Sequence, residues 1–288
     1  MKTLVIGATG NVGSKVVQGL VAKGVNVRVM TRNADKAKGT MPGNVEIMTG
    51  DLTDPMTAKA CFEGCDAVFM LNPVAMTECQ EGLAGVCLAQ AAGVKKFVYM
   101  GVQHASVAPH IPHFGSKAAI ELAIKNSGMK WTILQPNNFF QNDYWVKDAV
   151  MQMSVYPQPI GDVGCHRVDA RDIADAAVNA LTKTNFENKA YVLCGPKPIN
   201  GASCAEMWST GLGKKIAYAG NDLDQWGKAM SSMLPSWMVF DFGVMYAHFQ
   251  KSGLKATDAE VKACEEIVGH PLRTFEAFVT ETCAAWKA

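Results

Sequence analysis

Three glycines near the start of the chain have a spacing suited to binding a phosphate-bearing ligand. Gly7, Gly10 and Gly13 follow an apolar run that ends at Ile6, with the spacing G-x-x-G-x-x-G rather than the commoner G-x-G-x-x-G. Between a strand and a helix, such glycines permit a tight turn, the approach of a pyrophosphate and close helix packing. The N–H groups at the helix N-terminus also attract an anion. We therefore predict a dinucleotide site, with a purely structural turn as the alternative; its candidate residues are Gly7, Thr9, Gly10, Asn11, Val12 and Gly13.

The end of the second predicted strand distinguishes between two dinucleotides. NAD sites usually place Asp or Glu there to hold the ribose 2′-hydroxyl, whereas an arginine accommodates a 2′-phosphate. This chain reads Thr31-Arg32-Asn33, and its next acidic residue is Asp35. The Arg32 guanidinium can donate two hydrogen bonds to a phosphate, and Thr31 or Asn33 could add neutral donors. We therefore predict NADP (NADPH) in preference to NAD; the alternative for Arg32 is a solvated loop charge.

The elements that would position these residues alternate regularly over the first half of the chain. The candidate strands are continuous apolar runs, as expected for parallel strands covered on both faces. Strands and helices in alternation, with short connections, predict an α/β fold with a doubly wound parallel sheet (Rossmann). The expected strands are Thr3–Ile6, Asn26–Met30, Val45–Met48, Ala67–Leu71, Phe97–Met100 and Trp131–Leu134, and the expected helices are Val12–Lys23, Pro55–Phe62, Thr77–Ala92 and Gly115–Asn126.

The alternating pattern loosens after Pro136. A helix near Val168–Thr182 and a strand at Tyr191–Cys194 predict further units of the same sheet, and helical segments dominate the last third of the chain. We therefore divide the chain into a dinucleotide-binding Rossmann core over residues 1–136 and a second region over residues 137–288. The second region is expected to hold those sheet units and a smaller, mainly helical part that covers the substrate.

Several segments together resemble the NmrA-like branch of the atypical short-chain dehydrogenases. That branch holds both reductases and nicotinamide-sensing regulators, so the resemblance implies the fold and the cofactor more specifically than the reaction. It also implies that Asp51 and Leu52 lie beside the adenine, and Asn72 and Pro73 beside the nicotinamide ribose. The segments that carry it are Gly7-Ala-Thr-Gly-Asn-Val-Gly13, Thr31-Arg32, Gly50-Asp-Leu-Thr-Asp54, Trp131-Thr-Ile-Leu-Gln-Pro136, Val168-Asp-Ala-Arg-Asp-Ile-Ala174 and Gly269-His-Pro-Leu-Arg-Thr-Phe275.

The positions implied for Asp51, Leu52, Asn72 and Pro73 agree with the predicted topology. Each residue follows the C-terminal end of a predicted strand, where ligands of open α/β sheets bind. Structural roles are the alternatives, because an aspartate can start a turn and a proline can end a strand.

The helix after the fifth strand departs from the usual catalytic pattern of short-chain dehydrogenases. Those enzymes carry Tyr-x-x-x-Lys there, so that both side chains share a helical face and the lysine lowers the pKa of the tyrosine. Here His113-Phe-Gly-Ser-Lys117 takes that place, and none of the six tyrosines precedes a lysine at this spacing. We predict that Lys117 contacts the nicotinamide ribose and supports catalysis. His113 is a candidate proton donor, or equally a loop histidine without a chemical role.

Candidate substrate contacts follow the sixth strand. Asn138, Phe139 and Gln141 combine apolar surface with amide donors that could orient a carbonyl group. The alternative is an N-capped helix that packs two phenylalanines into the core. The Met- and Trp-rich stretch from Trp226 to Met245 could close an apolar pocket, or form a helix–helix interface.

These features favour an NADPH-dependent reductase of a small apolar acceptor, such as a quinone, an enone or an aromatic carbonyl compound. The alternative is a non-enzymatic NADP(H)-binding redox sensor that acts through a partner protein. The absence of the Tyr-x-x-x-Lys pair favours the sensor, whereas Lys117 and the apolar stretch favour the enzyme. Either function is compatible with a homo-oligomer or a regulatory protein partner.

The composition excludes several other classes of protein. The 288 residues carry a formal net charge of +1 without a basic run, so no nucleic-acid partner is expected. No apolar run reaches the length of a membrane span, and no signal pattern precedes the first strand. The nine cysteines, an odd number, predict reduced thiols, and the spacing of His104, His110 and His113 predicts no metal site. We expect a cytoplasmic protein whose partner is a small-molecule substrate.

Overall fold

The computed structural model describes residues 1–287, which fold into two compact units. Each unit is assembled from separate stretches of the chain. Unit 1 comprises Met1–Pro136, Ala170–Val192 and Ala263–His270. Unit 2 comprises Asn137–Asp169, Leu193–Lys262 and the chain from Pro271 onward. Unit 1 therefore combines the predicted dinucleotide-binding core with two later stretches.

Unit 1 is built on a seven-stranded sheet with the order β3-β2-β1-β4-β5-β6-β8. The pairs β1–β2, β1–β4, β2–β3, β4–β5 and β5–β6 are parallel. The strand order reverses between β1 and β4, which makes this the switch point at which doubly wound sheets bind ligands. The predicted Rossmann sheet is thus confirmed, and its strands are β1 (Lys2–Ile6), β2 (Asn26–Thr31), β3 (Glu46–Thr49), β4 (Ala67–Met70), β5 (Lys96–Met100), β6 (Lys130–Pro136) and β8 (Lys189–Leu193).

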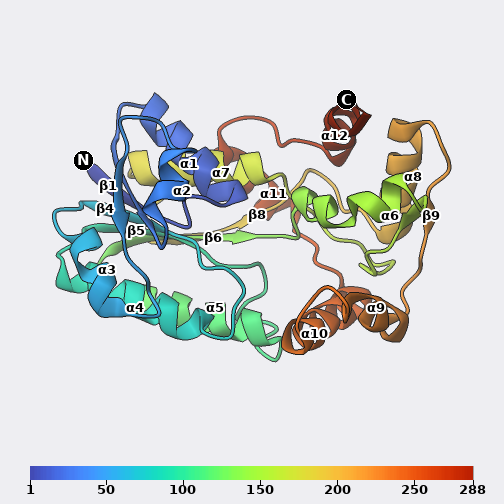
Figure 1. Cartoon of the computed structure of the whole chain (residues 1–288), viewed down its shortest axis with the longest axis horizontal. Coiled ribbons are helices and arrows are strands. Elements are labelled where there is room, and N and C mark those ends of the chain that lie inside the picture. The colour runs from blue at the N-terminus through green and yellow to red at the C-terminus, as the bar shows by residue number, and fades with distance from the viewer. Residues whose placement is uncertain (288) are drawn as a thin grey trace. The chain divides into compact units, whose positions relative to one another are not determined.

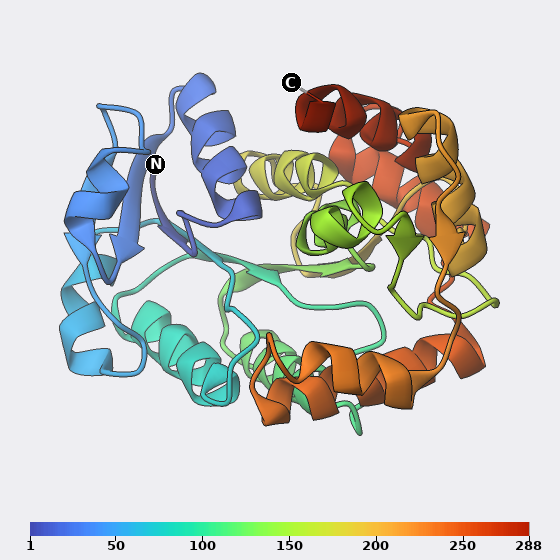
Figure 2. The same cartoon turned by 45° about the vertical axis from the view of Figure 1, so that its right-hand side comes forward.

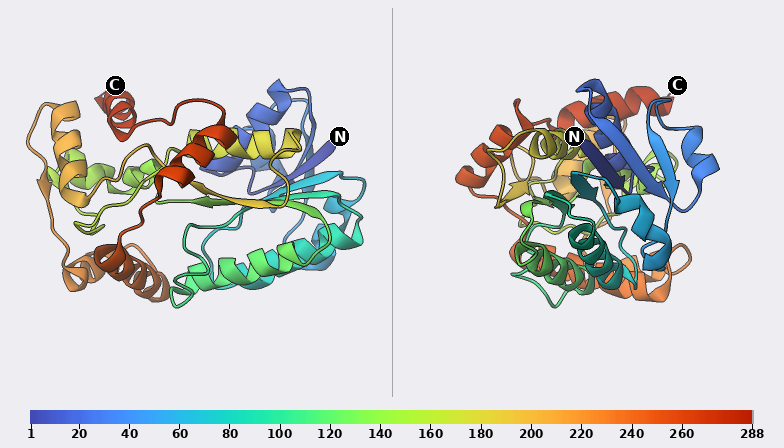
Figure 3. Two further views of the ribbon diagram at one scale, coloured as in Figure 1. Left: turned by 180° about the vertical axis from the view of Figure 1, so that it is seen from behind. Right: turned by 90° about the vertical axis from the view of Figure 1, so that its left-hand side faces the viewer.

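Helices cover both faces of this sheet. Figure 1 shows α1 and α7 on one face and α4 and α5 on the other, and the reverse view in Figure 3 shows the same layers. Helix α1 packs against α7, and α4 packs against α5. The helices of unit 1 are α1 (Asn11–Ala22), α2 (Ala34–Lys38), α3 (Pro55–Phe62), α4 (Glu78–Ala91), α5 (Pro112–Lys125), α7 (Ala170–Thr182) and the last residues of α11 (Asp258–Val268).

The largest differences from the prediction among the helices of unit 1 concern α5 and α2. Helix α5 begins at Pro112, three residues before the predicted start, because proline fits the first helical position, where no N–H is needed. The short helix α2 was not predicted; Asn33 starts it by accepting a hydrogen bond from the Lys36 N–H.

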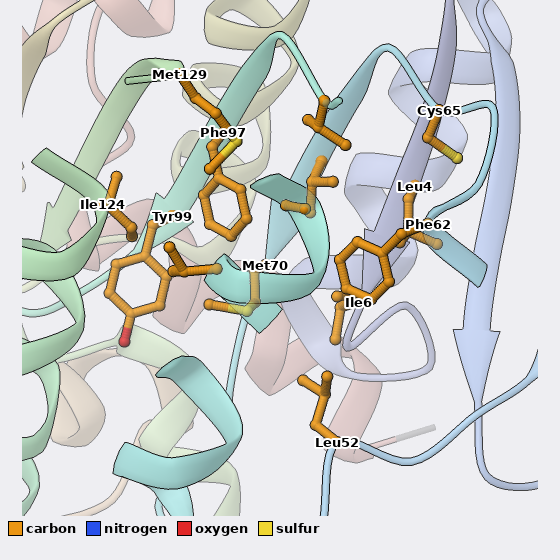
Figure 4. Close-up of a cluster of buried hydrophobic side chains, with 14 of the residues drawn as sticks. Leu4, Ile6, Leu52, Phe62, Cys65, Met70, Phe97, Tyr99, Ile124 and Met129 are labelled. Atoms are coloured by element: carbon orange, nitrogen blue, oxygen red, sulfur yellow. The ribbon is translucent and has the colours of Figure 1, made fainter. Parts of the chain in front are cut away.

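The core between the sheet and helices α3, α4 and α5 is apolar. Figure 4 shows Met70 of β4 and the rings of Phe97 and Tyr99 of β5 beside Ile124 of α5. Burying such side chains contributes about 1.5–3 kcal/mol each, which anchors the helices at fixed positions along the strands. The first turns of α4 and α5 are thereby held at the C-terminal edge of β4 and β5.

Unit 2 is mainly helical. Its helix α8 packs against α12 (Figure 2). The rings of Trp208 and Trp286 stack with centroids 4.7 Å apart. The Met- and Trp-rich stretch forms α9 and α10, which pack on each other. The elements of unit 2 are η1 (Phe140–Val146), α6 (Lys147–Met151), β7 (Val155–Tyr156), α8 (Gly201–Leu212), β9 (Ala217–Tyr218), α9 (Leu223–Met230), α10 (Ser236–Ser252), the first residues of α11 and α12 (Phe275–Lys287).

Within residues 1–287, no helix combines the length and the apolar character that crossing a bilayer requires.

Candidate functional site

The glycine-rich turn lies between β1 and α1, and its three glycines have different surroundings. Gly7 has a φ of +81°, and an added Cβ would lie 2.8 Å from the Leu71 carbonyl oxygen. A Cβ on Gly13 would lie 2.1 Å from the carbonyl oxygen of Gly7. A Cβ on Gly10 would meet only that same oxygen among the described residues, at 3.4 Å. The chain's own packing therefore requires Gly7 and Gly13, whereas Gly10 leaves bare, exposed backbone.

The start of α1 provides hydrogen-bond donors next to this bare backbone. Gly10 is the N-cap residue, and no described side chain caps the helix. The first intrahelical bond runs from the Ser14 N–H to the Gly10 carbonyl at 3.0 Å, so the N–H groups of Asn11, Val12 and Gly13 have no acceptor within the helix. Thr9 and Asn11 are exposed beside them. This arrangement suits the phosphates of a dinucleotide.

Arg32 follows β2 with an exposed side chain. The pKa of Asp51 is below its ordinary value, mainly through a hydrogen bond from the Thr53 backbone and in part through the charge of Arg32. The two residues therefore lie at the same edge of neighbouring strands, β2 and β3. Thr31 and Asn33 have local partners: the Asn33 N–H donates to Thr31 Oγ1 at 3.2 Å, and Asn33 Oδ1 caps α2. Arg32 is thus the cation at this strand end that a 2′-phosphate could meet.

Asp51 and Leu52 follow β3 in a turn. The Thr53 N–H donates to Asp51 Oδ1 at 2.9 Å, so the turn role considered for Asp51 is present. Leu52 is buried and belongs to the core cluster. Their predicted contact with an adenine stays a prediction.

Asn72 lies just beyond β4 and has an unsatisfied polar atom. It is only 3% exposed, and its Oδ1 has no hydrogen-bond partner within residues 1–287. Buried carbonyl oxygens almost always have a donor, so such an atom marks a place where a bound group could supply one. Pro73 beside it is exposed. With the bare backbone at Gly10, Asn72 gives unit 1 two features that fit a dinucleotide at the switch point.

Lys117 lies in the second turn of α5 and is buried. Its Nζ forms an ion pair with Glu78 Oε1 at 2.5 Å, and the side chains are 6% and 0% exposed. The same Nζ lies 6.0 Å from the centroid of the Tyr99 ring. Sequence reasoning missed Glu78, because an acidic residue at the start of a helix is common and nothing in its spacing links it to Lys117.

His113 is the second residue of α5, so the loop position considered for it is wrong. Its side chain is buried, and its ring packs edge-on against Phe114 with centroids 4.8 Å apart. His113 and Lys117 are four residues apart and share the buried face of the helix. A third buried polar residue on this face, Glu121, accepts hydrogen bonds from Gln135 at 2.9 and 3.1 Å and was also missed.

The candidate substrate residues belong to unit 2 and contact other parts of it. Asn138 Oδ1 accepts a hydrogen bond from Arg167 Nε at 2.9 Å, and Gln141 Nε2 donates to Asp169 Oδ1 at 3.0 Å. The Phe139 carbonyl accepts from Arg167 Nη2 at 2.6 Å. The helix predicted as the alternative is a 3-10 helix with Phe139 at its N-cap. Substrate contact by these residues stays a prediction.

Comparison with known proteins assigns the chain to a family. A model of the NmrA-like family matches residues 1–279. The chain belongs to the NmrA-like family. An NAD(P)H azoreductase of Xenophilus azovorans is 33% identical over 99% of this chain and 99% of its own length. This NmrA-like chain is also 30% identical to a (4-alkanoyl-5-oxo-2,5-dihydrofuran-3-yl)methyl phosphate reductase of Streptomyces griseus, over 98% of each chain.

The fold of this NmrA-like protein is shared by solved structures. An NADPH-dependent quinone oxidoreductase of Escherichia coli, complexed with NADPH, has a TM-score of 0.87 and 22% identity, covering 99% of this chain and 100% of that one. The resemblance noted in the sequence is therefore confirmed for both family and fold.

Proposed function

We propose that this chain is an NADPH-dependent reductase of a small, largely apolar acceptor such as a quinone, an enone or an aromatic carbonyl compound. The observation that carries the proposal is the burial of Lys117. This lysine lies in the second turn of α5, at the same edge of the sheet as the residues of unit 1 that fit a dinucleotide. The names of the relatives support it, because they describe reductases that use NAD(P)H or NADPH.

The cofactor in this proposal is NADPH rather than NADH. Gly10 and the free N–H groups of Asn11 and Val12 would hold the pyrophosphate, and Arg32 would pair with the 2′-phosphate. Asp51 and Leu52 are the proposed adenine contacts. Asn72 and Pro73, with Lys117, are the proposed contacts of the nicotinamide ribose, where a ribose hydroxyl could satisfy Asn72 Oδ1.

Bound NADPH would supply a hydride to the acceptor. Lys117 would hold its ammonium group at the ribose, and His113 would be the group from which the reduced acceptor takes a proton. Asn138, Phe139 and Gln141 are the proposed substrate contacts. Because no Tyr-x-x-x-Lys pair is present, we expect the acceptor to be conjugated. The negative charge that a conjugated acceptor gains on hydride addition is delocalised, so its reduction depends less on a strong proton donor.

The test is NADPH oxidation with a panel of quinones, enones and aromatic carbonyl compounds, with a simple aliphatic ketone as the control substrate. We expect turnover of the conjugated compounds and little with the ketone. Lys117→Met should lower kcat/KM by about 100-fold, whereas Lys125→Met, at an exposed position of the same helix, should not. Tight NADPH binding without turnover of any acceptor would instead support a redox sensor acting through a partner protein.

A further inference from the structure

The ion pair between Glu78 and Lys117 joins two helices that follow neighbouring strands. Helix α4 begins at Glu78 after β4, and Lys117 lies in the second turn of α5 after β5. Strands β4 and β5 pair in parallel, so the early turns of both helices lie at the same edge of the sheet. Helices α4 and α5 also pack against each other. The contact is therefore set by the topology of the sheet and not by nearness in the sequence.

The other polar side chains near this ion pair have partners or contacts of their own. Glu121, one turn beyond Lys117 on α5, accepts two hydrogen bonds from Gln135 of β6 and lies 3.9 Å from Lys125. Tyr99 of β5 presents its ring to Lys117, and burial raises the pKa of its hydroxyl well above the ordinary value. Cys79 follows Glu78 on α4 and lies within electrostatic range of Tyr99. Glu78 is the carboxylate in direct contact with the Lys117 ammonium.

A buried ammonium needs its carboxylate partner for two reasons. A charge taken out of water is costly unless an opposite charge compensates it. The lysine stem also has four rotatable bonds, so an unpaired Nζ would not keep one position. Glu78 is itself fully buried on α4, so its Oε1 provides a fixed point for the ammonium.

We propose that Glu78 is a positioning residue, which holds the Lys117 ammonium in place for the nicotinamide ribose. This inference rests on the proposed function, since it assumes that a dinucleotide binds at this edge. In this role Glu78 acts through its contact with Lys117.

The test measures NADPH affinity by fluorescence titration of the full chain. We expect Glu78→Gln to weaken binding about tenfold, because the Lys117 ammonium loses its charged partner and its fixed position. Glu81→Gln, one turn along α4 in a partly exposed position, is the matched control and should behave as the wild type.

A cycle with Lys117→Met distinguishes positioning from a structural role. Glu78→Gln should weaken NADPH binding no further once Lys117 has been replaced, whereas independent effects would add. Glu78→Asp keeps the charge but shortens the side chain, so it should weaken binding less than Glu78→Gln does. It also serves as the decisive variant should Glu78→Gln not fold.

Wild-type NADPH affinity in both Glu78→Gln and Glu78→Asp, with only a lower Tm, would overturn the positioning role. The readout is binding rather than turnover. A wild type that binds NADPH but reduces no acceptor would therefore contradict the proposed reductase while leaving this inference testable.

Discussion

Gly13 of α1 packs directly on Gly7 of the preceding turn, so closely that a Cβ on Gly13 would lie 2.1 Å from the Gly7 carbonyl oxygen. This contact closes the turn and holds the start of α1 against the end of β1. Gly10, between the two, has no comparable contact. Within these seven residues, Gly7 and Gly13 thus have a structural role, whereas Gly10 is the candidate for binding.

Alanine substitutions should separate these two tasks. Gly13→Ala should destabilise the protein by more than about 3 kcal/mol, because the contacted atoms are backbone and cannot move aside. Gly10→Ala should cost no more than about 1 kcal/mol, and its methyl group should obstruct the pyrophosphate and weaken NADPH binding. Thermal unfolding and cofactor titration of both variants measure this. A Gly10→Ala protein with normal NADPH affinity would contradict the assignment of Gly10.

Arg32→Glu tests the choice of cofactor. Replacing the cation with an anion should weaken NADPH binding by at least about 100-fold while changing NADH binding much less, since only NADPH carries a 2′-phosphate. Lys36→Glu reverses the same charge at another exposed position, in α2, and is the control. Parallel titrations with both cofactors measure the ratio. Equal losses for NADPH and NADH would show that Arg32 does not contact the phosphate.

The stability of unit 2 should depend on a buried ion pair. Arg167 Nη2 lies 2.7 Å from Asp143 Oδ1, both side chains are fully buried, and Trp208 Nε1 donates to Asp143 Oδ2 at 2.8 Å. Asp143→Asn leaves the arginine charge uncompensated and should lower the free energy of unfolding by about 3–5 kcal/mol. The double variant Arg167→Met/Asp143→Leu should be more stable than Asp143→Asn in denaturant unfolding. A double variant that is less stable than the single one would contradict this view.

The stability of the protein should depend on pH in part through the ionisation of Glu121. Burial raises the pKa of this carboxyl above its ordinary value of 4.5. A raised pKa in the folded protein means that folding favours the protonated carboxyl group. This stabilisation is therefore complete below the pKa of the unfolded state and is lost as the pH rises through the pKa of the folded state. Glu121→Gln does not titrate. Its Tm relative to the wild type should therefore increase between about pH 4 and about pH 8. A difference that shrinks with pH would contradict the prediction.

The cysteines should differ sharply in reactivity. All nine lie in the described part of the chain, and none forms a disulfide there, as the sequence predicted. Cys87 is exposed on α4, whereas burial raises the pKa of Cys165 to about 12 and that of Cys204 to about 11. Because the thiolate is the reactive form, iodoacetamide should modify Cys87 first and the other two only on unfolding. Mass spectrometry of the labelled native protein measures this; equal rates would contradict it.

The sequence by itself determined the features that depend on neighbouring residues. The apolar runs predicted each strand of the sheet, and the glycine spacing predicted a turn that opens a helix. Arg32 could be placed because a residue after a strand of a parallel sheet lies at a known edge. Local conformation and side-chain periodicity follow from short stretches of chain, so these predictions needed no knowledge of the packing.

Only the tertiary structure decided which buried polar groups meet. Glu78 and Lys117 are separated by 39 residues, and their contact depends on which turns of α4 and α5 face each other. The same holds for Glu121 with Gln135, for Arg167 with Asp143, and for the unsatisfied Oδ1 of Asn72. Such contacts depend on how the packing of apolar side chains fixes the position and rotation of each helix on the sheet. A shift of one residue along a helix would place a buried carboxylate beside a different neighbour.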